Sequence, residues 1–251
     1  MTIRLEKHGA TAHLLIDRAA KRNAFDLAMW QALPRILGNV AEDQNLRMLV
    51  LRAAEPGAFC AGADLGELLA NKDDVSWRAA NQSAINRAQF ELARFELPTI
   101  AFVDGDCVGG GCGLALACDL RVATGRARFG ITPAKLGLVY PLHDVKLLTD
   151  LVGPGQAKRL LFTGSLIGSE EALRIGLIEA MGEDIAIFAD PILAVSPHSA
   201  RSIKGMVRRV LDGQVRDDDD TLAMFAAAFT GPDFLEGISA FVDKRKPEFR
   251  R

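Results

Sequence analysis

Hydrophobic and polar positions change their spacing along the first part of the chain. Residues 2–6 and 11–17 alternate between apolar and polar side chains, and Gly9 lies between them, so this segment predicts a β-hairpin. Asp26 is suited to cap a helix, although Pro34 falls within that helix and is expected to bend or shorten it. The apolar positions that indicate the helix are Leu27, Trp30, Leu33 and Leu37.

Short apolar runs recur after this helix, at 47–52, 99–103 and 120–123. Each run is typical of a buried strand, and helical segments lie between the runs. Strands that alternate with helices indicate βαβ units, whereas the pattern is helical from about residue 186 onward. We therefore predict an α/β fold with a helical C-terminal region.

Charge and hydropathy exclude some classes of partner. The 251 residues carry a formal net charge of −2 and the basic residues are scattered, so nothing favours nucleic acid or an anionic membrane. The acidic run 217–220 is expected to be a solvated helix start. The N-terminus lacks the apolar core of a signal peptide, and Asp104 and Asp106 interrupt the most apolar stretch, 99–118. We expect a soluble, cytoplasmic protein.

The four cysteines do not form a convincing metal site. They are Cys60, Cys107, Cys112 and Cys118, and no cluster of histidines accompanies them. Reduced thiols that pack as small apolar side chains are the better interpretation.

Two loops rich in small residues each join a predicted strand to a predicted helix. In the first, 59–64, small side chains allow a ligand to approach the amide of Ala63. In the second, 108–112, three glycines leave the first amides of a helix bare. Either segment alone is more often a tight turn. Together they favour an oxyanion hole, in which the loss of one donor typically costs ~2.7–4 kcal/mol of transition-state stabilisation.

Four segments, in this order, resemble the enoyl-CoA hydratase/isomerase (crotonase) family. Residues 18–24 are similar to its RPxxxNA loop, with Ala19 in place of the proline, and residues 59–65 to its AFxAGADL loop. Residues 104–119 are similar to its xGxxxGGGxxLALACD segment, and 236–247 to its EGxxAFxxKRxP ending. The resemblance covers nearly the whole chain.

This resemblance implies a fold, an assembly and a substrate class. The fold would be a ββα spiral over 1–195 with a helical trimerisation region over 196–251, assembled as a homotrimer or a dimer of trimers. Ala63 and Gly110 would hold the thioester oxygen of an acyl-CoA as it becomes an enolate, with coenzyme A as part of the substrate and no separate cofactor or metal. The residues expected to bind the substrate are Lys21, Arg22, Ala24, Ala61, Asp64, Leu65, Val108, Pro133, Leu138, Phe241 and Lys244.

The sequence departs from the family at two positions that carry proton chemistry. Hydratases of the family use two glutamates, and the matching positions here hold Gly113 and Pro133. Adding water across a double bond needs a base for the water and an acid for the carbon. Hydration by the usual route is therefore not expected.

Decarboxylation of a malonyl-type thioester needs an enolate hole but no base, because loss of CO2 leaves the electron pair behind. Residues 132–140 resemble the T-P-x-x-L-G-x-x-Y segment of methylmalonyl-CoA decarboxylases, which ends at Tyr140, a candidate to orient a carboxylate or to supply a proton. The match is partial, since Ala63 replaces the histidine of those enzymes and Gly113 their glutamate. A tyrosine that merely packs at a helix entrance is an equal interpretation.

His143 and Asp144 follow, where a helix is predicted to begin. Asp144 is expected to be an N-cap or an acid of the first turn. His143 is a candidate proton shuttle, because imidazoles as a class titrate near neutrality, although surface placement is the simpler interpretation. Two alternatives to decarboxylation stay open: an enoyl-CoA hydratase or isomerase that uses His143 or Tyr140 as its acid or base, and a non-catalytic acyl-CoA-binding subunit.

Overall fold

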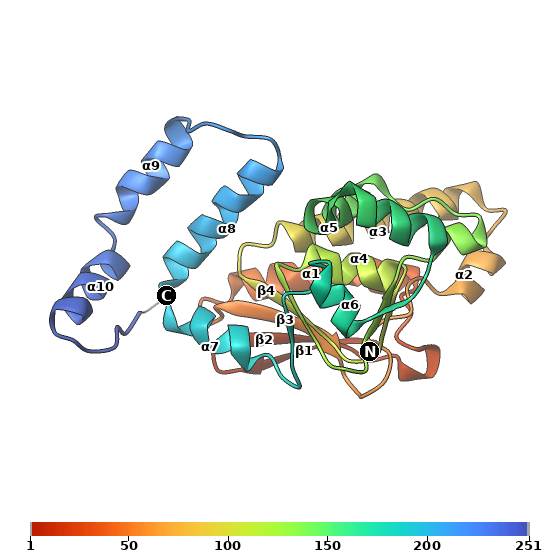
Figure 1. Ribbon diagram of the computed structural model, residues 1–251, viewed down its shortest axis with the longest axis horizontal. Coiled ribbons are helices and arrows are strands. Elements are labelled where there is room, and N and C mark those ends of the chain that lie inside the picture. The colour runs from red at the N-terminus through yellow and green to blue at the C-terminus, as the bar shows by residue number, and fades with distance from the viewer. Residues whose placement is uncertain (1, 250–251) are drawn as a thin grey trace.

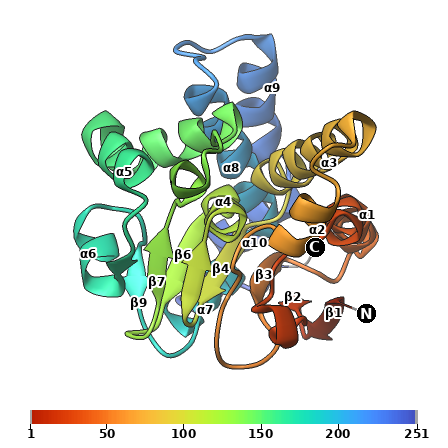
Figure 2. The same ribbon diagram turned by 90° about the vertical axis from the view of Figure 1, so that its right-hand side faces the viewer.

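The N-terminal hairpin forms one edge of a six-stranded sheet in the computed structural model, which describes residues 2–249 (Figure 2). β1 (Ile3–His8) and β2 (Thr11–Ile16) pair antiparallel, which confirms the predicted hairpin. The remaining neighbours pair parallel, which confirms the predicted βαβ units. In order across the sheet after β2 they are β3 (Met48–Ala53), β4 (Thr99–Val103), β6 (Leu120–Ala123) and β9 (Ala180–Met181).

Helices cover one face of this sheet, and the first begins where the sequence predicts. Asp26 caps α1 (Leu27–Glu42) by accepting a hydrogen bond from the Met29 amide. Pro34 does not shorten α1, which continues to Glu42 with the proline ring buried. The other helices of the core are α2 (Leu65–Ala70), α3 (Val75–Ala93), α4 (Gly110–Ala117), α5 (Leu142–Thr163) and α6 (Ser169–Arg174).

Met48 to Leu51 of β3 are all apolar because both faces of the sheet are covered. Leu49 and Leu51 lie in the main hydrophobic core, whereas Met48 and Val50 lie in a smaller cluster with Ala189. Ala189 belongs to α7 (Ala186–Ala194), which Figure 2 shows on the opposite side of the sheet from α3, α4 and α5. Alternate side chains of a strand point to opposite faces, so a strand between two helical layers has no polar face.

A second, smaller sheet lies beside the site described below. β5 (Asp106–Val108) pairs parallel with β7 (Arg128–Gly130), which pairs antiparallel with β8 (Ile167–Gly168). Two short 3-10 helices, η1 (Ala19–Lys21) and η2 (Pro133–Leu136), follow β2 and β7 in the chain.

The last three helices extend away from the sheet as an arm (Figure 1). Asp218 caps α9, which confirms that the acidic run is a helix start. Within residues 2–249, no helix is long and apolar enough to cross a membrane. The arm consists of α8 (Pro197–Leu211), α9 (Asp219–Ala228) and α10 (Pro232–Val242).

Arg121 of β6 ties the sheet to the C-terminal end of α4. Its side chain is 1% exposed. The guanidinium donates hydrogen bonds to the carbonyl oxygens of Cys118 (2.7 Å) and Leu177 (2.9 Å) and forms an ion pair with Glu179. A charge this deeply buried is tolerated only because its donors are satisfied.

The cysteines pack as the sequence predicts. All four are free and buried. Burial raises the pKa of the Cys60 thiol, and likewise that of Cys118, to about 12, so both stay protonated and apolar in character.

Candidate functional site

The loop that precedes α2 lies against the N-terminus of α4. The Cys60 amide donates to the Asp106 carbonyl (3.0 Å) and the Val108 amide donates to the Cys60 carbonyl (2.9 Å), so the two segments are joined like adjacent strands. Gly62 continues this contact with a φ of +95°. A Cβ atom there would lie 2.9 Å from the Val108 carbonyl oxygen and 3.1 Å from the Gly110 nitrogen, so only glycine allows this approach.

Ala63 and Gly110 both carry an available backbone donor at this junction. Among residues 2–249, neither amide donates a hydrogen bond to a protein acceptor. Gly110 is the first residue of α4, where an amide has no partner inside the helix. Because α4 begins at Gly110, the Gly110 amide lies at the end of the helix where the first amides have no partner.

The loop at 18–24 holds Ala63 in place from the other side. Phe25 pairs with Ala63, since the Phe25 amide donates to the Gly62 carbonyl (2.7 Å) and the Asp64 amide donates to the Phe25 carbonyl (2.8 Å). Arg18 donates to the Ala24 carbonyl (2.8 Å) and forms an ion pair with Asp64 (2.8 Å). Ala24 is buried by these contacts, whereas Lys21 and Ala61 are at least partly exposed.

Asp64 is a structural anion in this arrangement. Its carboxylate caps α2 by accepting hydrogen bonds from the Gly66 and Glu67 amides. Burial raises the pKa of Asp64, but the hydrogen bonds from Arg18 and from those amides outweigh it, and the pKa is lowered overall. The carboxyl is therefore ionised at neutral pH, and it positions the Ala63 loop rather than supplying a proton.

Four polar side chains lie beside Gly113, one turn into α4. A Cβ atom at this position would lie 2.2 Å from the Gln89 Nε2, 3.0 Å from the Asp144 Oδ2 and 3.1 Å from the Tyr140 Oη. His143 contacts this group through its Nδ1, 3.4 Å from the Asp144 Oδ1. Side chains from α3 and from the start of α5 thus meet beside Gly113 of α4.

Tyr140 lies beside Gly113, and His143 reaches this point through Asp144. The Tyr140 hydroxyl donates a hydrogen bond to the Gly109 carbonyl (3.0 Å), directly before the Gly110 amide. Burial, and after it the Asp144 carboxyl, raise the pKa of Tyr140 well above its ordinary value, so the phenol stays protonated. The His143 side chain is about one-fifth exposed.

Asp144 and Gln89 are the members of this group to which sequence reasoning gave no catalytic role. Asp144 is a first-turn acid of α5 as predicted, but it caps nothing, because the N-cap is Pro141 and the carboxyl faces inward. Burial raises its pKa, and the contacts with His143 and with the Gln89 side chain oppose part of this effect. Within the described residues, neither its Oδ2 nor the polar atoms of Gln89 make a well-aligned hydrogen bond, although Gln89 lies close enough to lower the pKa of the carboxyl. The only sequence signal for Asp144 was its place beside His143.

The other predicted contact residues lie around this centre with differing exposure. Val108 ends β5 and is partly buried, next to the glycines of α4. Pro133 opens η2, which follows β7. Leu65 and Leu138 are more than half exposed (55% and 51%) and are free to contact an apolar ligand.

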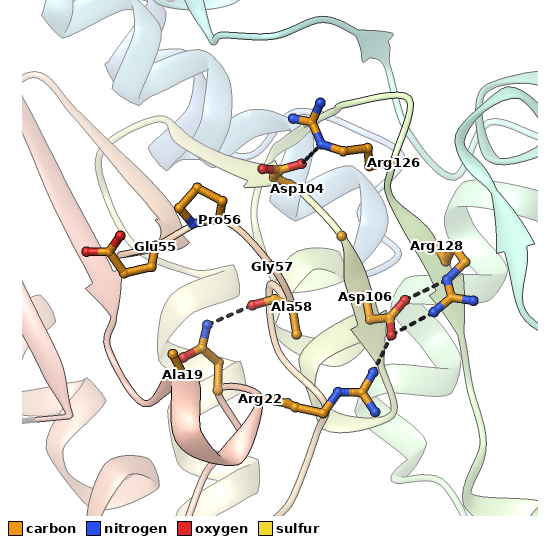
Figure 3. Close-up of a pocket in the computed structure, with 12 residues that line it drawn as sticks. Ala19, Arg22, Glu55, Pro56, Gly57, Ala58, Asp104, Asp106, Arg126 and Arg128 are labelled. Carbon is orange, nitrogen blue, oxygen red and sulfur yellow. Dashed lines mark hydrogen bonds and ion pairs between the residues drawn. The ribbon is translucent and has the colours of Figure 1, made fainter.

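Arg22 lines a separate polar cavity of about 640 Å³ (Figure 3). Its guanidinium points at Asp106, which Arg128 also contacts from the other side, at 2.7 Å from the Arg128 Nε. Arg126 and Asp104 form a second pair across the cavity (2.9 Å). Each arginine there has a carboxylate partner, and Asp106 is shared by two of them.

Phe241 and Lys244 lie apart from the rest of the predicted site within one chain. Phe241 is at the end of α10 and is 84% exposed, and Lys244 follows that helix. Figure 1 shows α10 in the arm, at the opposite end of the molecule from α2. The structure does not bring these two side chains to Ala63 and Gly110 of the same chain.

Comparison with known proteins shows the family to which this chain belongs. The sequence profile of the family described as "Enoyl-CoA hydratase/isomerase" matches residues 6–251, nearly the whole chain. The chain belongs to this family. It is therefore an enzyme of the hydratase/isomerase family, which acts on acyl-CoA thioesters.

Relatives and solved structures of the family match this chain over most of their lengths. The chain is 32% identical to the short-chain-enoyl-CoA hydratase of Clostridium acetobutylicum, over 97% of this chain and 95% of that protein. It is 30% identical to the mitochondrial methylglutaconyl-CoA hydratase of Mus musculus, over 98% and 81%. A putative enoyl-CoA hydratase/isomerase family protein from Hyphomonas neptunium superposes with a TM-score of 0.96 at 36% identity, covering 100% and 98% of the two chains. The predicted crotonase fold is confirmed.

Proposed function

We propose that this family member stabilises the enolate of its acyl-CoA substrate with the amides of Ala63 and Gly110. The observation that carries the proposal is the contact between their loops, in which a Cβ on Gly62 would lie 3.1 Å from the Gly110 nitrogen. Gly62 directly precedes Ala63, so two unpaired donors lie at one junction. Donors fixed in this way stabilise the charge that develops on a thioester oxygen.

Decarboxylation of a malonyl-CoA-type thioester is the reaction that we propose first. Gly113 and Pro133 stand where the family resemblance places its two glutamates, and this reaction requires no base. Breaking the bond between Cα and the carboxylate carbon leaves its electron pair on Cα, delocalised onto the thioester oxygen. The enolate then takes up one proton. Gln89, Asp144 and Tyr140, which surround Gly113, offer donors but no pair of carboxylates to activate water.

Isomerisation of an enoyl-CoA is the second candidate, and one observation favours it. A single buried carboxyl, Asp144, lies beside the helix that carries Gly110. Moving a double bond by one position requires that one group remove a proton and return it to another carbon, so one carboxyl suffices. The hydratase names of relatives such as that from Clostridium acetobutylicum point to enoyl-CoA substrates for this alternative.

A substrate panel tests the two reactions. The protein is incubated with malonyl-, methylmalonyl- and ethylmalonyl-CoA while CO2 release is measured, and separately with crotonyl-CoA and a 3-enoyl-CoA while hydration and double-bond movement are measured. We expect CO2 release from at least one malonyl-type thioester. Intact acyl-CoA binding without CO2 release contradicts decarboxylation, and movement of the double bond in the 3-enoyl-CoA then supports isomerisation.

We further propose that the enzyme assembles as a homotrimer or a dimer of trimers. Apolar side chains of the arm are exposed in the single chain, among them Phe225 (68%) and Phe241 (84%). Exposed apolar surface of this kind is typical of subunit interfaces. A neighbouring subunit would also bring its Phe241 and Lys244 toward the site of this one. Light scattering of the purified protein measures the mass, and a monomer contradicts the proposal.

A further inference from the structure

We propose that the carboxyl group of Asp144 transfers the proton at the α carbon of the acyl group, across Gly113. This inference rests on the proposed enolate chemistry of Ala63 and Gly110 and names the acid that the chemistry requires. The carboxyl comes from α5, whereas the family resemblance places its glutamates at Gly113 of α4 and at Pro133. Geometry and burial both support the assignment.

Asp144 is placed correctly relative to the oxyanion donor. Gly113 follows Gly110 by three residues in α4, which is about 4.5 Å along a helix axis at 1.5 Å per residue. Residues three apart share a helix face, and their Cβ vectors lean toward the N-terminus. The Asp144 Oδ2, 3.0 Å from that Cβ position, therefore lies on the side of α4 where the Gly110 amide would hold a thioester oxygen. The α and β carbons of the acyl group extend from that oxygen over a similar span.

Asp144 is buried in a way that a purely structural carboxyl would not be. The residue is 1% exposed, and its Oδ2 has no hydrogen-bond partner among the described residues. Leaving a buried carboxyl oxygen unpaired costs free energy, so an oxygen of this kind requires an explanation. The Gln89 side chain is near this carboxyl and accounts for part of its environment, and Oδ2, which points at Gly113, is the oxygen that is free to meet a substrate proton.

Gly113 is the residue that makes room for this carboxyl. Any side chain there would begin 2.2 Å from the Gln89 Nε2 and 3.0 Å from Asp144, so a glutamate at 113 and the present cluster exclude each other. The glycine is thus coupled to a carboxyl on another helix. Gln89 also lies beside the Gly113 Cβ position. Both of its polar atoms lack a well-aligned hydrogen bond within the described chain, so we assign it as a positioning residue for the carboxyl or for the acyl group.

His143 lies between the buried carboxyl and an open cavity. Its Nδ1 lies 3.4 Å from the Asp144 Oδ1, on the carboxyl oxygen opposite the one that faces Gly113. The same imidazole lines a cavity of about 440 Å³ together with Asn86 and Phe90 of α3. Its Nε2 is buried and has no hydrogen-bond partner among the described residues, so the ring must turn toward the cavity before it can take a proton from solvent.

Every proton that the two reactions take up or release can be accounted for by Asp144 and water. In decarboxylation, protonated Asp144 gives its proton to the Cα of the enolate, the thioester carbonyl re-forms, and the carboxylate regains a proton from water. In isomerisation, ionised Asp144 removes a proton from one carbon of the acyl group and returns it to another. Both reactions contain the same step, the transfer of a proton between Asp144 and Cα.

Deuterium exchange at Cα tests that step apart from the net reaction. Butyryl-CoA, which has Cα protons but no carboxylate to lose, is incubated in D2O with the wild type, Asp144→Asn and Asp150→Asn, and deuterium uptake is measured by mass spectrometry. Asp150 is a matched control, because it lies on the same helix α5 in an exposed ion pair with Lys146. We expect exchange in the wild type and in Asp150→Asn, and a loss of at least about a hundredfold in Asp144→Asn. Calorimetry should show butyryl-CoA binding unchanged within about threefold in all three proteins.

The outcomes separate this inference from the proposed reaction. No exchange in the wild type, or exchange in Asp144→Asn within about threefold of the wild type, overturns the assignment of Asp144. If malonyl-type thioesters lose CO2 while exchange does not depend on Asp144, the enolate chemistry stands and the assignment is wrong. If exchange depends on Asp144 but no CO2 is released, the assignment stands and decarboxylation is wrong. Circular dichroism of each variant establishes that it is folded.

Discussion

The Asp144 carboxyl oxygen lies 3.0 Å from the point at which a Cβ atom of Gly113 would stand. The two residues belong to different helices and are separated by about thirty residues of chain. Gly113 thus leaves space on one helix at the place where a carboxyl arrives from another. Several measurable consequences follow from this relationship and from the loops that surround it.

Gly113→Ala is expected to damage activity more than stability. The added methyl group would meet Gln89 at 2.2 Å and Asp144 at 3.0 Å, and both side chains must move. Overpacking of this kind typically costs about 1–3 kcal/mol. Displacing a reacting group by about 1 Å can cost a hundredfold in rate. Turnover of the active substrate and urea denaturation measure the two effects.

Gly38→Ala is the control for that variant. Gly38 lies on the exposed side of α1, and a Cβ there would meet nothing within 4 Å. The substitution should raise the unfolding free energy by about 0.5–1 kcal/mol and leave turnover unchanged. Equal losses of turnover in both variants would contradict the special role of Gly113.

Gly62→Ala is expected to disrupt the proposed oxyanion hole. Its φ of +95° disfavours any side chain, and the new Cβ would lie 2.9 Å from the Val108 carbonyl oxygen, so the Ala63 loop must move away from α4. The loss of one oxyanion donor typically lowers kcat by about 10²–10³. Steady-state kinetics measure the effect, with Gly125→Ala as the control because nothing lies within 4 Å of its Cβ position. A kcat that falls less than about tenfold contradicts the prediction.

Tyr140→Phe distinguishes a proton donor from a positioning residue. The hydroxyl already donates its proton to the Gly109 carbonyl, at 3.0 Å, so we expect the phenol to orient the start of α4. Removing it should lower kcat by about tenfold or less and stability by about 1 kcal/mol. A loss of kcat as large as that of Asp144→Asn would instead make Tyr140 the proton source.

The stability of the protein should depend on pH through Asp144. Burial raises the pKa of this carboxyl above its ordinary value of 3.8, so the folded state binds the proton more tightly than the unfolded chain does. The unfolding free energy therefore falls as the pH rises from 3.8 through the folded pKa. Asp144→Asn removes this titration. Urea denaturation of both proteins across acid and neutral pH should show the variant gaining stability relative to the wild type as the pH rises; a constant difference contradicts the prediction.

Arg121→Met is expected to destabilise the fold strongly. The variant leaves Glu179 without its ion pair and the carbonyl oxygens of Cys118 and Leu177 without donors. Breaking a buried ion pair from one side typically costs about 3–5 kcal/mol. Arg126→Met removes an exposed ion pair with Asp104 and should change the unfolding free energy little. Denaturation midpoints that shift equally in the two variants would contradict this difference.

Most elements of the fold could be predicted from local patterns. The hairpin, the helix capped by Asp26 and the buried strands at β3, β4 and β6 follow from alternation, capping and short apolar runs. Pro34 does not shorten α1, one of the two effects expected of it, because burial of the helix against the core outweighs the local cost of a proline. Residue spacing also located Ala63 and Gly110, since small residues and glycines mark places where the backbone must be approached.

The partners of Gly113 could not be predicted in the same way. Gln89 lies near the C-terminal end of α3, where a glutamine is usually a surface residue, and Asp144 lies in a first turn, where an acid usually caps or faces water. Neither residue carries a local signal, because burial and convergence depend on how α3, α4 and α5 pack.

The sequence by itself determined that two bare amides follow two buried strands and that Gly113 and Pro133 stand where the family resemblance places acids. It could do so because glycine runs, small residues and the absence of an acidic residue at a given position can be read directly from the sequence. Only the tertiary structure decided that the Asp144 carboxyl fills the space beside Gly113, since three helices distant in sequence must pack together to bury it. The feature that most influences the proposed chemistry is therefore set by packing and not by any motif.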